Sequence, residues 1–300
     1  MTRSEILEKF RNITVWKSGD KRAPHKPLLI LLSLAEYQKG NKTLLFGDIE
    51  EKLNQLLFEF GSVPNPRSYY PFIRLSSNGI WTFNNPQVIA DYQGADPSSK
   101  YLRENAISGY FTEEIQKEFD NDPSLIIEIA LETLETHFPE SLHDDILDSI
   151  GFLKSGFIIT TKRKRDPAFR EKVLIAYEYQ CAICGFNVRL GNQPLAIEAA
   201  HIRWHQANGP DIEENGLALC SLHHKLFDLG AFTVSKDYNL QVSDRVNGTI
   251  GKQEWLLNFH NKKIREPQSN NYLPNPSYLN WHVKEVFKGF GRDISKNHPT

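Results

Sequence analysis

Four residues in the second half of the chain have the types and spacing of a zinc site. Two residues separate Cys181 from Cys184, and the pair Cys220 and His223 repeats that spacing further along the chain. Two such close pairs can offer four ligands to one tetrahedral ion, because each short turn presents both of its ligands on one side. Four protein ligands leave no open position for a substrate, so we expect this Zn²⁺ to be structural.

A disulfide explains these cysteines less well than a metal does. The chain has 3 cysteines, so one disulfide would leave one of them unpaired. The N-terminus, Met-Thr-Arg-Ser-Glu, has no apolar targeting region, and disulfides persist in oxidising compartments. We therefore expect a cytoplasmic protein. No apolar run is long enough to cross a bilayer, so we expect no membrane partner.

Three more polar residues lie within or next to this pattern. His201 ends an apolar run, Asn215 follows 14 residues later, and His224 comes directly after His223. Hydrolysis of a phosphodiester needs an activated water, a cation at the phosphate and help for the leaving oxygen. His201 can take the proton of the water, and His224 can hold a divalent ion such as Mg²⁺ or Mn²⁺. The Asn215 amide can bridge a loop and orient His201.

Residues 181–232 resemble the zinc-bearing HNH endonucleases, in which His201, Asn215 and His224 would supply the three letters. The resemblance implies a ββα-metal nuclease domain. One position departs from it, because many HNH enzymes carry a carboxylate directly before the first histidine and this chain has Ala200. Glu198 lies two residues earlier on the same strand face and could be the second metal ligand, although an ordinary solvent-facing glutamate explains it equally well. We expect His205 to be a loop or phosphate contact.

These residues need elements to position them, and 300 residues are enough for two domains. The composition changes around residues 151–165, which end in the basic run from Lys162 to Arg165. We therefore place a first domain at 1–150, a linker at 151–165 and a nuclease domain at 166–300. Asp166-Pro167 predicts a helix that leads into the first cysteine pair, and residues 231–243 predict a hairpin after Gly230 ends a helix.

The first domain is predicted to be mostly helical. Helical periodicity and cap residues predict helices starting near Thr2, Pro27, Asp48 and Asp122. Residues 70–75 and 80–83 are β-rich and flank an Asn-Gly turn, which predicts a hairpin. Helices followed by a hairpin indicate a winged-helix-like arrangement, so the expected fold class is α+β, with a DNA-binding domain followed by an HNH domain.

The charge of the chain is strongly partitioned. Residues 113–150 contain 12 acidic side chains and one basic side chain, Lys117. Because the whole chain carries a formal charge of −2, the remainder carries +9. Such a partition permits binding of double-stranded DNA without proving it.

Two stretches of the first domain resemble the sulfur-binding domain of phosphorothioate-dependent type IV restriction endonucleases over roughly residues 5–150. They run from Arg22 through His25 and Lys26 to Pro27, and from Tyr70 through Pro71 to Arg74 and Leu75. The resemblance implies that Tyr70 and Pro71 form an apolar pocket for sulfur, and that His25, Lys26, Arg74 and Arg22 contact phosphates or base edges. From the residues alone, Tyr70-Pro71 could equally be the apolar start of a strand, and His25 a helix cap.

The resulting hypothesis is a restriction endonuclease that recognises phosphorothioated DNA and cuts nearby. One alternative is an HNH nuclease directed to methylated or otherwise modified DNA, and another is a zinc-stabilised DNA-binding protein without catalysis. A scaffold would need none of His201, Asn215 and His224, which favours the nuclease. Double-strand cleavage by one site per chain favours a homodimer or sequential nicking, and Trp281 and Phe287 could pack within the chain or across an interface.

Overall fold

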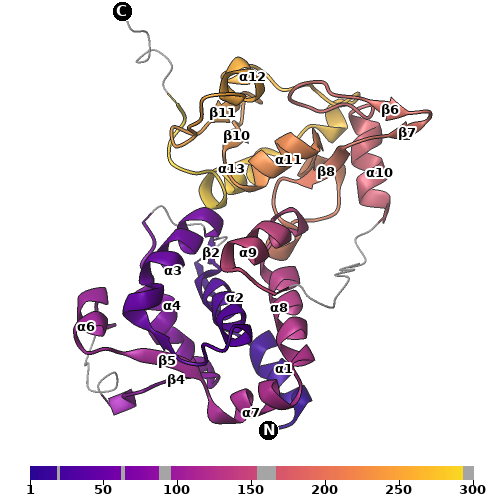
Figure 1. Ribbon diagram of the computed structural model, residues 1–300. Helices are drawn as coiled ribbons and strands as arrows, with labels where there is room; N and C mark the ends of the chain where they lie inside the picture. The colour runs from indigo at the N-terminus through magenta and orange to yellow at the C-terminus, as the bar shows by residue number, and fades with distance from the viewer. Residues whose placement is uncertain (19–20, 62–64, 88–95, 154–166, 293–300) are drawn as a thin grey trace, which may run out of the picture. The chain divides into compact units, whose positions relative to one another are not determined.

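The computed structural model describes residues 1–18, 21–61, 65–87, 96–153 and 167–292 (Figure 1). The chain divides into two compact units, Met1–Thr161 and Lys162–Thr300. Most of the predicted linker at 151–165, the basic run that it contains and Asp166 lie outside the described residues. Each unit is described by itself below.

Unit 1 is mostly helical. Its helices are α1 (Arg3–Arg11), α2 (His25–Gln38), α3 (Phe46–Phe60), α4 (Tyr69–Arg74), α6 (Ser99–Glu104), α7 (Glu113–Asn121), α8 (Ser124–His137) and α9 (His143–Ile150), with short 3₁₀ turns at Leu75–Asn78 and Glu140–Leu142. Its strands are β1 (Trp16–Ser18), β2 (Lys21–Ala23), β3 (Leu44–Leu45), β4 (Trp81–Phe83) and β5 (Ser108–Phe111).

Helix α2 is the centre of unit 1. Its apolar run is buried around the whole circumference of the helix, as expected for a helix surrounded by others. Helices α3, α4, α8 and α9 pack against it. The predicted helix start near Thr2 is confirmed, and Thr2 and Glu5 form a capping box there, in which each side chain bonds the backbone of the other residue. Helix α3 starts earlier than expected, since Leu45 is its N-cap and Asp48 lies in its first turn.

The predicted hairpin at residues 70–83 is wrong. Residues 69–74 form helix α4, in which Pro71 occupies the first turn, where proline is tolerated. Asn78-Gly79 ends the following 3₁₀ turn instead of making a hairpin turn, with Gly79 in the left-handed region at φ 67°. Packing of Phe72, Ile73 and Leu75 into the core overrides their local strand propensity.

Strand β4 pairs with a distant partner instead. It is antiparallel to β5, with Trp81 opposite Phe111, and β5 also pairs with β3. The close approach at Gly109 explains its residue type, because a Cβ there would lie 2.4 Å from the Trp81 ring. The winged-helix-like arrangement is therefore not confirmed, since the hairpin on which it rested is replaced by this three-stranded sheet.

Unit 2 contains the predicted strand–strand–helix core. Its helices are α10 (Pro167–Ala176), α11 (Ser221–Asp228), α12 (Lys252–Trp255) and α13 (Pro276–Glu285), and its strands are β6 (Arg189–Leu190), β7 (Gln193–Pro194), β8 (Ile197–His201), β9 (Gly216–Cys220), β10 (Phe232–Val234) and β11 (Leu240–Val242). Strands β8 and β9 are antiparallel. Helices α10 and α11 both pack on this pair, which explains why β9 is a continuous buried run.

The expected α+β class is confirmed, as is the hairpin after Gly230, which β10 and β11 form. Trp281 of α13 packs within its own unit against Trp204, with ring centroids 5.8 Å apart. Among the described residues, no helix has both the length and the apolar character that a membrane span requires.

Candidate functional site

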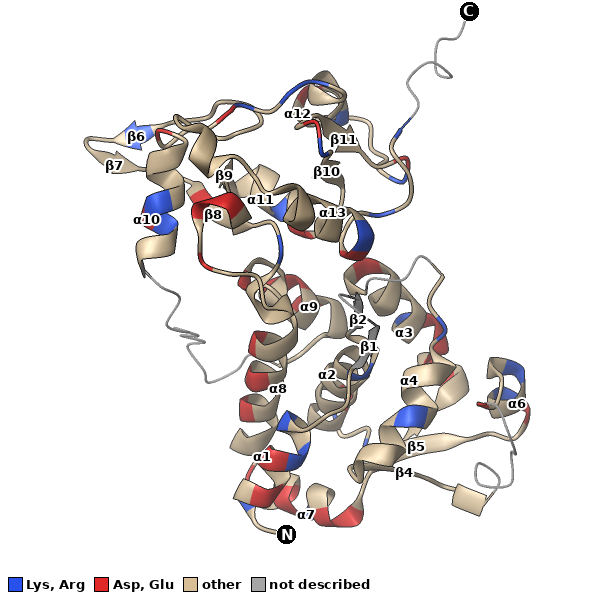
Figure 2. Ribbon diagram, turned by 180° about the vertical axis from the view of Figure 1, so that it is seen from behind, with Lys and Arg blue, Asp and Glu red and all other residues tan. Residues whose placement is uncertain are grey.

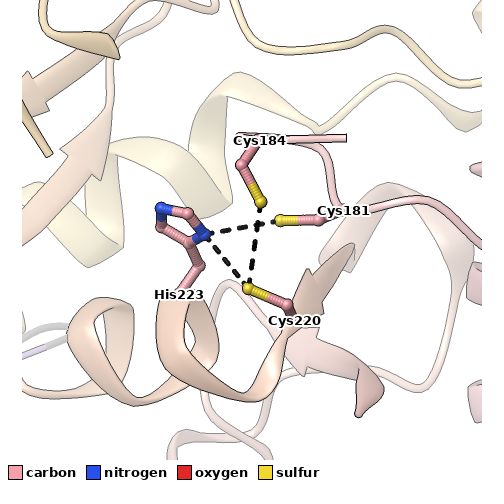
Figure 3. Close-up of side chains that lie close together, drawn as sticks. All are labelled: Cys181, Cys184, Cys220 and His223. Carbon is pink, nitrogen blue, oxygen red and sulfur yellow. Dashed lines mark hydrogen bonds between the residues drawn. The ribbon is translucent and has the colours of Figure 1, made fainter. Parts of the chain in front are cut away.

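The four predicted zinc ligands come together in unit 2 (Figure 3). Cys181 and Cys184 lie in the loop after α10, Cys220 ends β9, and His223 lies in the first turn of α11. Their ligand atoms all lie within 4.8 Å of one another. His223 Nδ1 is 3.6 Å from Cys181 Sγ and 3.2 Å from Cys220 Sγ, and the sulfur atoms of Cys184 and Cys220 are 4.0 Å apart.

This cluster fits a zinc ion. Tetrahedral bonds of about 2.3 Å to sulfur and about 2.1 Å to nitrogen place two sulfur atoms about 3.8 Å apart, and sulfur and nitrogen about 3.6 Å apart. The separation of Cys181 Sγ from His223 Nδ1 and that of the Cys184 and Cys220 sulfur atoms lie close to these values, whereas Cys220 Sγ at 3.2 Å is nearer to His223 Nδ1 than the bound geometry requires. His223 Nε2 donates a hydrogen bond of 2.9 Å to the Trp255 carbonyl, which leaves Nδ1 as the ligand atom.

His201 stands at the end of β8 between an aromatic ring and a carboxylate. Its ring stacks on Phe169 of α10, with centroids 4.0 Å apart and planes 16° apart. Its Nε2 donates to Asp211 Oδ1 over 2.7 Å. The ring of His205 lies edge-on at 6.2 Å. Phe169 thus holds the imidazole on its face, and Asp211 holds it at Nε2.

Asn215 is fully buried and bridges the loop that leads back from His201. Its Oδ1 accepts a hydrogen bond from Arg203 N over 2.9 Å. Its Nδ2 donates to the carbonyls of Arg203 at 3.0 Å and Pro210 at 2.9 Å. This is the bridging geometry expected of the asparagine from its amide chemistry.

His224 lies between two carboxylates on the side of β8 that α11 covers. Its Nδ1 donates to Glu198 Oε2 over 2.6 Å, and its Nε2 donates to Asp228 Oδ2 over 3.1 Å. Ser221 Oγ donates to the other oxygen of Glu198 over 2.7 Å. The structure therefore brings Glu198 to His224, whereas Ala200 offers no ligand atom.

The electrostatics of this triad favour a cation. Burial lowers the pKa of His224, but the charge of Asp228 and the hydrogen bonds to both carboxylates outweigh it and raise the pKa to about 9. The hydrogen bond from His224 likewise lowers the pKa of Glu198, against the opposing effect of burial. The two carboxylates bond opposite nitrogens of the ring, so only Glu198 and His224 Nδ1 face each other as candidate ligands of one ion.

In unit 1, three of the predicted DNA-contacting residues lie near one another. The guanidinium of Arg74 lies over the Tyr70 ring, 4.6 Å from its centroid. Lys26 Nζ donates to Asn78 Oδ1 over 2.6 Å. Burial and the positive charge of Arg74 lower the pKa of Lys26. Arg74 also pairs with Asp96 at 2.6 Å.

The other predicted DNA contacts are placed less favourably. Pro71 is buried, while the neighbouring Tyr70 is half-buried. Burial lowers the pKa of His25 to about 4, so it is neutral at pH 7 and could contact DNA as a hydrogen-bonding group but not as a cation. Arg22 lies in β2 opposite Lys17 of β1.

Sequence reasoning missed several side chains at these sites. Asp228 could have been found from its i+4 spacing from His224 on one helix, but Asp211 and Phe169 carry no comparable local signal. In unit 1, Arg67 donates to the hydroxyls of Tyr69 and Tyr70 over 3.2 and 3.0 Å. Hydrogen bonds from Tyr69 and Arg67 lower the pKa of the Tyr70 hydroxyl.

The acidic segment predicted from the sequence lies on α7, α8 and α9 (Figure 2). Part of it serves the fold, because Arg3 pairs with Asp122 and Glu128, and Arg11 pairs with Glu132. Helix α1 is thereby tied to α8 through ion pairs at the surface. Lys26 and Arg74 lie outside this acidic segment.

Two family models match the chain. Residues 3–155 match the model described as "ScoMcrA-like, DNA sulfur-binding domain", which covers half of the chain. Residues 181–235 match the model of the HNH endonuclease. The second match contains all four residues of the cysteine and histidine cluster as well as His201, Asn215 and His224.

Solved structures resemble parts of the chain at low identity. The sulfur-binding domain of SprMcrA complexed with phosphorothioated DNA is 19% identical, with a TM-score of 0.42, covering 50% of this chain and 94% of that one. The corresponding ScoMcrA complex is 16% identical, with a TM-score of 0.42 and coverages of 48% and 94%. The modification-dependent TagI restriction endonuclease is 21% identical, with a TM-score of 0.29 and coverages of 41% and 38%. No curated protein matches the chain.

Proposed function

The chain belongs to the ScoMcrA-like family with a DNA sulfur-binding domain and carries an HNH endonuclease domain, and on that premise we propose that it is a type IV-like restriction endonuclease for phosphorothioated DNA. Unit 1 would recognise the modified backbone, and unit 2 would hydrolyse phosphodiester bonds nearby. The observation that carries this proposal is the joining of both domains in one chain, with each of the three HNH residues held by a specific partner.

Recognition of sulfur would use the region around Tyr70 and Arg74. A sulfur that replaces a non-bridging phosphate oxygen is larger and more weakly hydrated, so moving it from water to an aromatic or apolar surface costs less. Tyr70 offers such a surface, and Pro71 follows it in the first turn of α4. Arg74 and Lys26 would hold the neighbouring phosphates and supply the salt-dependent part of the affinity.

Hydrolysis would use His201 as the general base. Its Nε2 is engaged by Asp211, and the other ring nitrogen can take the proton of the attacking water. Asn215 would keep the loop beside His201 in place through its bonds to Arg203 and Pro210.

Two metal sites would serve different purposes. Cys181, Cys184, Cys220 and His223 would hold Zn²⁺, which joins the loop after α10 to the end of β9 and the start of α11. Glu198 and His224 would hold Mg²⁺ or Mn²⁺, with Asp228 as the carboxylate partner of His224. A bound divalent ion supplies positive charge for the phosphate as negative charge develops there.

Cleavage of matched DNA duplexes tests the proposal. Plain, cytosine-methylated and phosphorothioated duplexes of one sequence are incubated with the protein and Mg²⁺ or Mn²⁺. We expect cleavage of the phosphorothioated duplex only. Equal cleavage of the plain duplex would refute recognition of sulfur, and cleavage of the methylated duplex alone would identify a reader of base modification. Binding without cleavage of any duplex would indicate the non-catalytic alternative.

Two variants, with one control variant, separate the roles of the units. His201→Ala should abolish cleavage and keep binding of phosphorothioated DNA, whereas His137→Ala, a histidine substitution in unit 1, should keep both. Tyr70→Ala should weaken the preference for phosphorothioated over plain DNA. Sedimentation of the protein with and without the duplex then shows whether it binds DNA as a homodimer or as a single chain.

A further inference from the structure

Asp211 lies beside His201 and bonds one nitrogen of its ring. Its carboxylate accepts the hydrogen bond from His201 Nε2 at 2.7 Å. The His201 side chain is 10% exposed and that of Asp211 is 23% exposed, so the bond is largely shielded from water. Phe169 stacks on one face of the ring and limits its rotation. The carboxylate therefore meets an imidazole whose orientation is already restricted.

Asn215 in turn determines where Asp211 lies. Its amide donates to the carbonyl of Pro210, the residue directly before Asp211, and bonds both backbone groups of Arg203 at the other end of the loop. The loop is tightly closed, because a Cβ at Gly209 would lie 1.8 Å from Arg203 O and 2.8 Å from Asn215 Nδ2. The buried asparagine thus connects to His201 through the Pro210-Asp211 backbone.

A carboxylate bonded at Nε2 has a clear chemical consequence. The ionised carboxylate can only accept a hydrogen bond, so the neutral imidazole keeps its proton on Nε2 and its lone pair on Nδ1. When a water transfers its proton to Nδ1, the ring becomes an imidazolium, and the adjacent carboxylate stabilises that charge without taking the proton itself. A base in the opposite tautomer would have no lone pair on Nδ1.

We propose that Asp211 is a positioning residue that keeps His201 in the Nε2–H tautomer, and that Asn215 acts on His201 through it. This inference rests on the proposed function of His201 as the general base. The buried asparagine would act on the ring through a specific series of contacts, from Asn215 to Pro210, along the backbone to Asp211, and from Asp211 to the His201 ring. The metal-binding triad around His224 takes no part in this chain of contacts.

The tautomer of His201 is the first measurement. Long-range ¹H–¹⁵N NMR spectra of the full chain, with ¹⁵N-labelled histidine, are recorded above the pKa of this ring, and its signal is assigned by its loss in His201→Ala. We expect Nε2–H in the parent protein and in Asp237→Asn, an exposed substitution in the same unit. Asp211→Ala should populate the Nδ1–H form as well. An Nδ1–H ring in the parent, or no change in Asp211→Ala, would overturn the proposal.

Steady-state cleavage is the second measurement. Asp211→Ala should lower kcat by about 10- to 100-fold with little change in KM, because the base stays in place but loses its orientation. Asp211→Asn keeps an acceptor oxygen and the shape of the side chain, so it should fold even if the alanine variant does not. Its kcat should lie between that of the parent protein and that of Asp211→Ala. Parent-like kcat in both variants would overturn the proposal. A parent protein that cleaves no DNA would instead refute the nuclease function, and the NMR result would still decide the role of Asp211.

Discussion

Substitution of Asn215 by alanine is expected to damage both the stability of unit 2 and its catalysis. The side chain is fully buried and makes three hydrogen bonds, one from Arg203 N and two to the carbonyls of Arg203 and Pro210. Removing it leaves three backbone groups without this partner. At about 1 kcal/mol for each lost hydrogen bond, the free energy of unfolding should fall by about 3 kcal/mol.

Urea unfolding of the zinc-loaded chain measures this change. Of the 5 tryptophans, Trp204 lies in the bridged loop and packs against Trp281, so these two contribute the part of the fluorescence change that reports on the region that the substitution affects. Asn271→Ala is the matched control, because this asparagine is exposed in the same unit, and surface changes usually stay within about 0.5 kcal/mol. Cleavage should be measured without denaturant, where both variants remain folded.

The catalytic effect should exceed the loss of folded protein. With His201 no longer oriented through the Pro210-Asp211 backbone, kcat should fall by about 10- to 100-fold while zinc content stays at that of the parent. An unfolding free energy within about 1 kcal/mol of the parent, together with unchanged kcat, would refute the bridging role of Asn215.

Three further predictions concern other sites. Cys220→Ser should lower the zinc content from about one ion per chain and abolish cleavage, while DNA binding by unit 1 persists, as measured by metal analysis and a binding assay. Burial lowers the pKa of His282 to about 3, so below pH 6.5 the unfolded chain binds a proton that the folded chain excludes. The free energy of unfolding should then fall by about 2 kcal/mol between pH 7 and 5, and His282→Gln should remove this part of its pH dependence. Lys26→Ala should reduce the salt dependence of DNA affinity by about one ion, whereas Lys117→Ala, on acidic α7, should leave it unchanged.

The cluster of four candidate metal ligands could be predicted because its signal is local. Two residues separate the ligands in each pair, and a short turn at Cys181 or a first helical turn at His223 presents both ligands together wherever the rest of the chain lies. Bringing the two ligand pairs together requires only one long-range contact, which a bound metal ion would itself impose. The structure brings the four ligand atoms together as that spacing predicts.

The error at residues 70–83 shows where local signals fail. An Asn-Gly turn between β-rich runs favours a hairpin in a short peptide. In the folded unit, burial of Phe72 and Leu75 makes the first of these runs helical. Gly79, the glycine of the Asn-Gly pair, then ends the 3₁₀ turn that follows the helix. Strand β4 then finds its partner in β5, which no local pattern links to it.

The sequence by itself determined which chemistry this protein has available: a cysteine and histidine cluster that could bind a metal ion, three HNH residues in order, and a mostly helical first domain with basic residues outside its acidic segment. These depend on residue type and short spacing. Only the tertiary structure decided that Asp211 meets His201, that Glu198 and Asp228 flank His224, and that Arg74 lies over Tyr70. Those contacts depend on strand register and on how loops and helices pack, so they arise only when the whole unit folds.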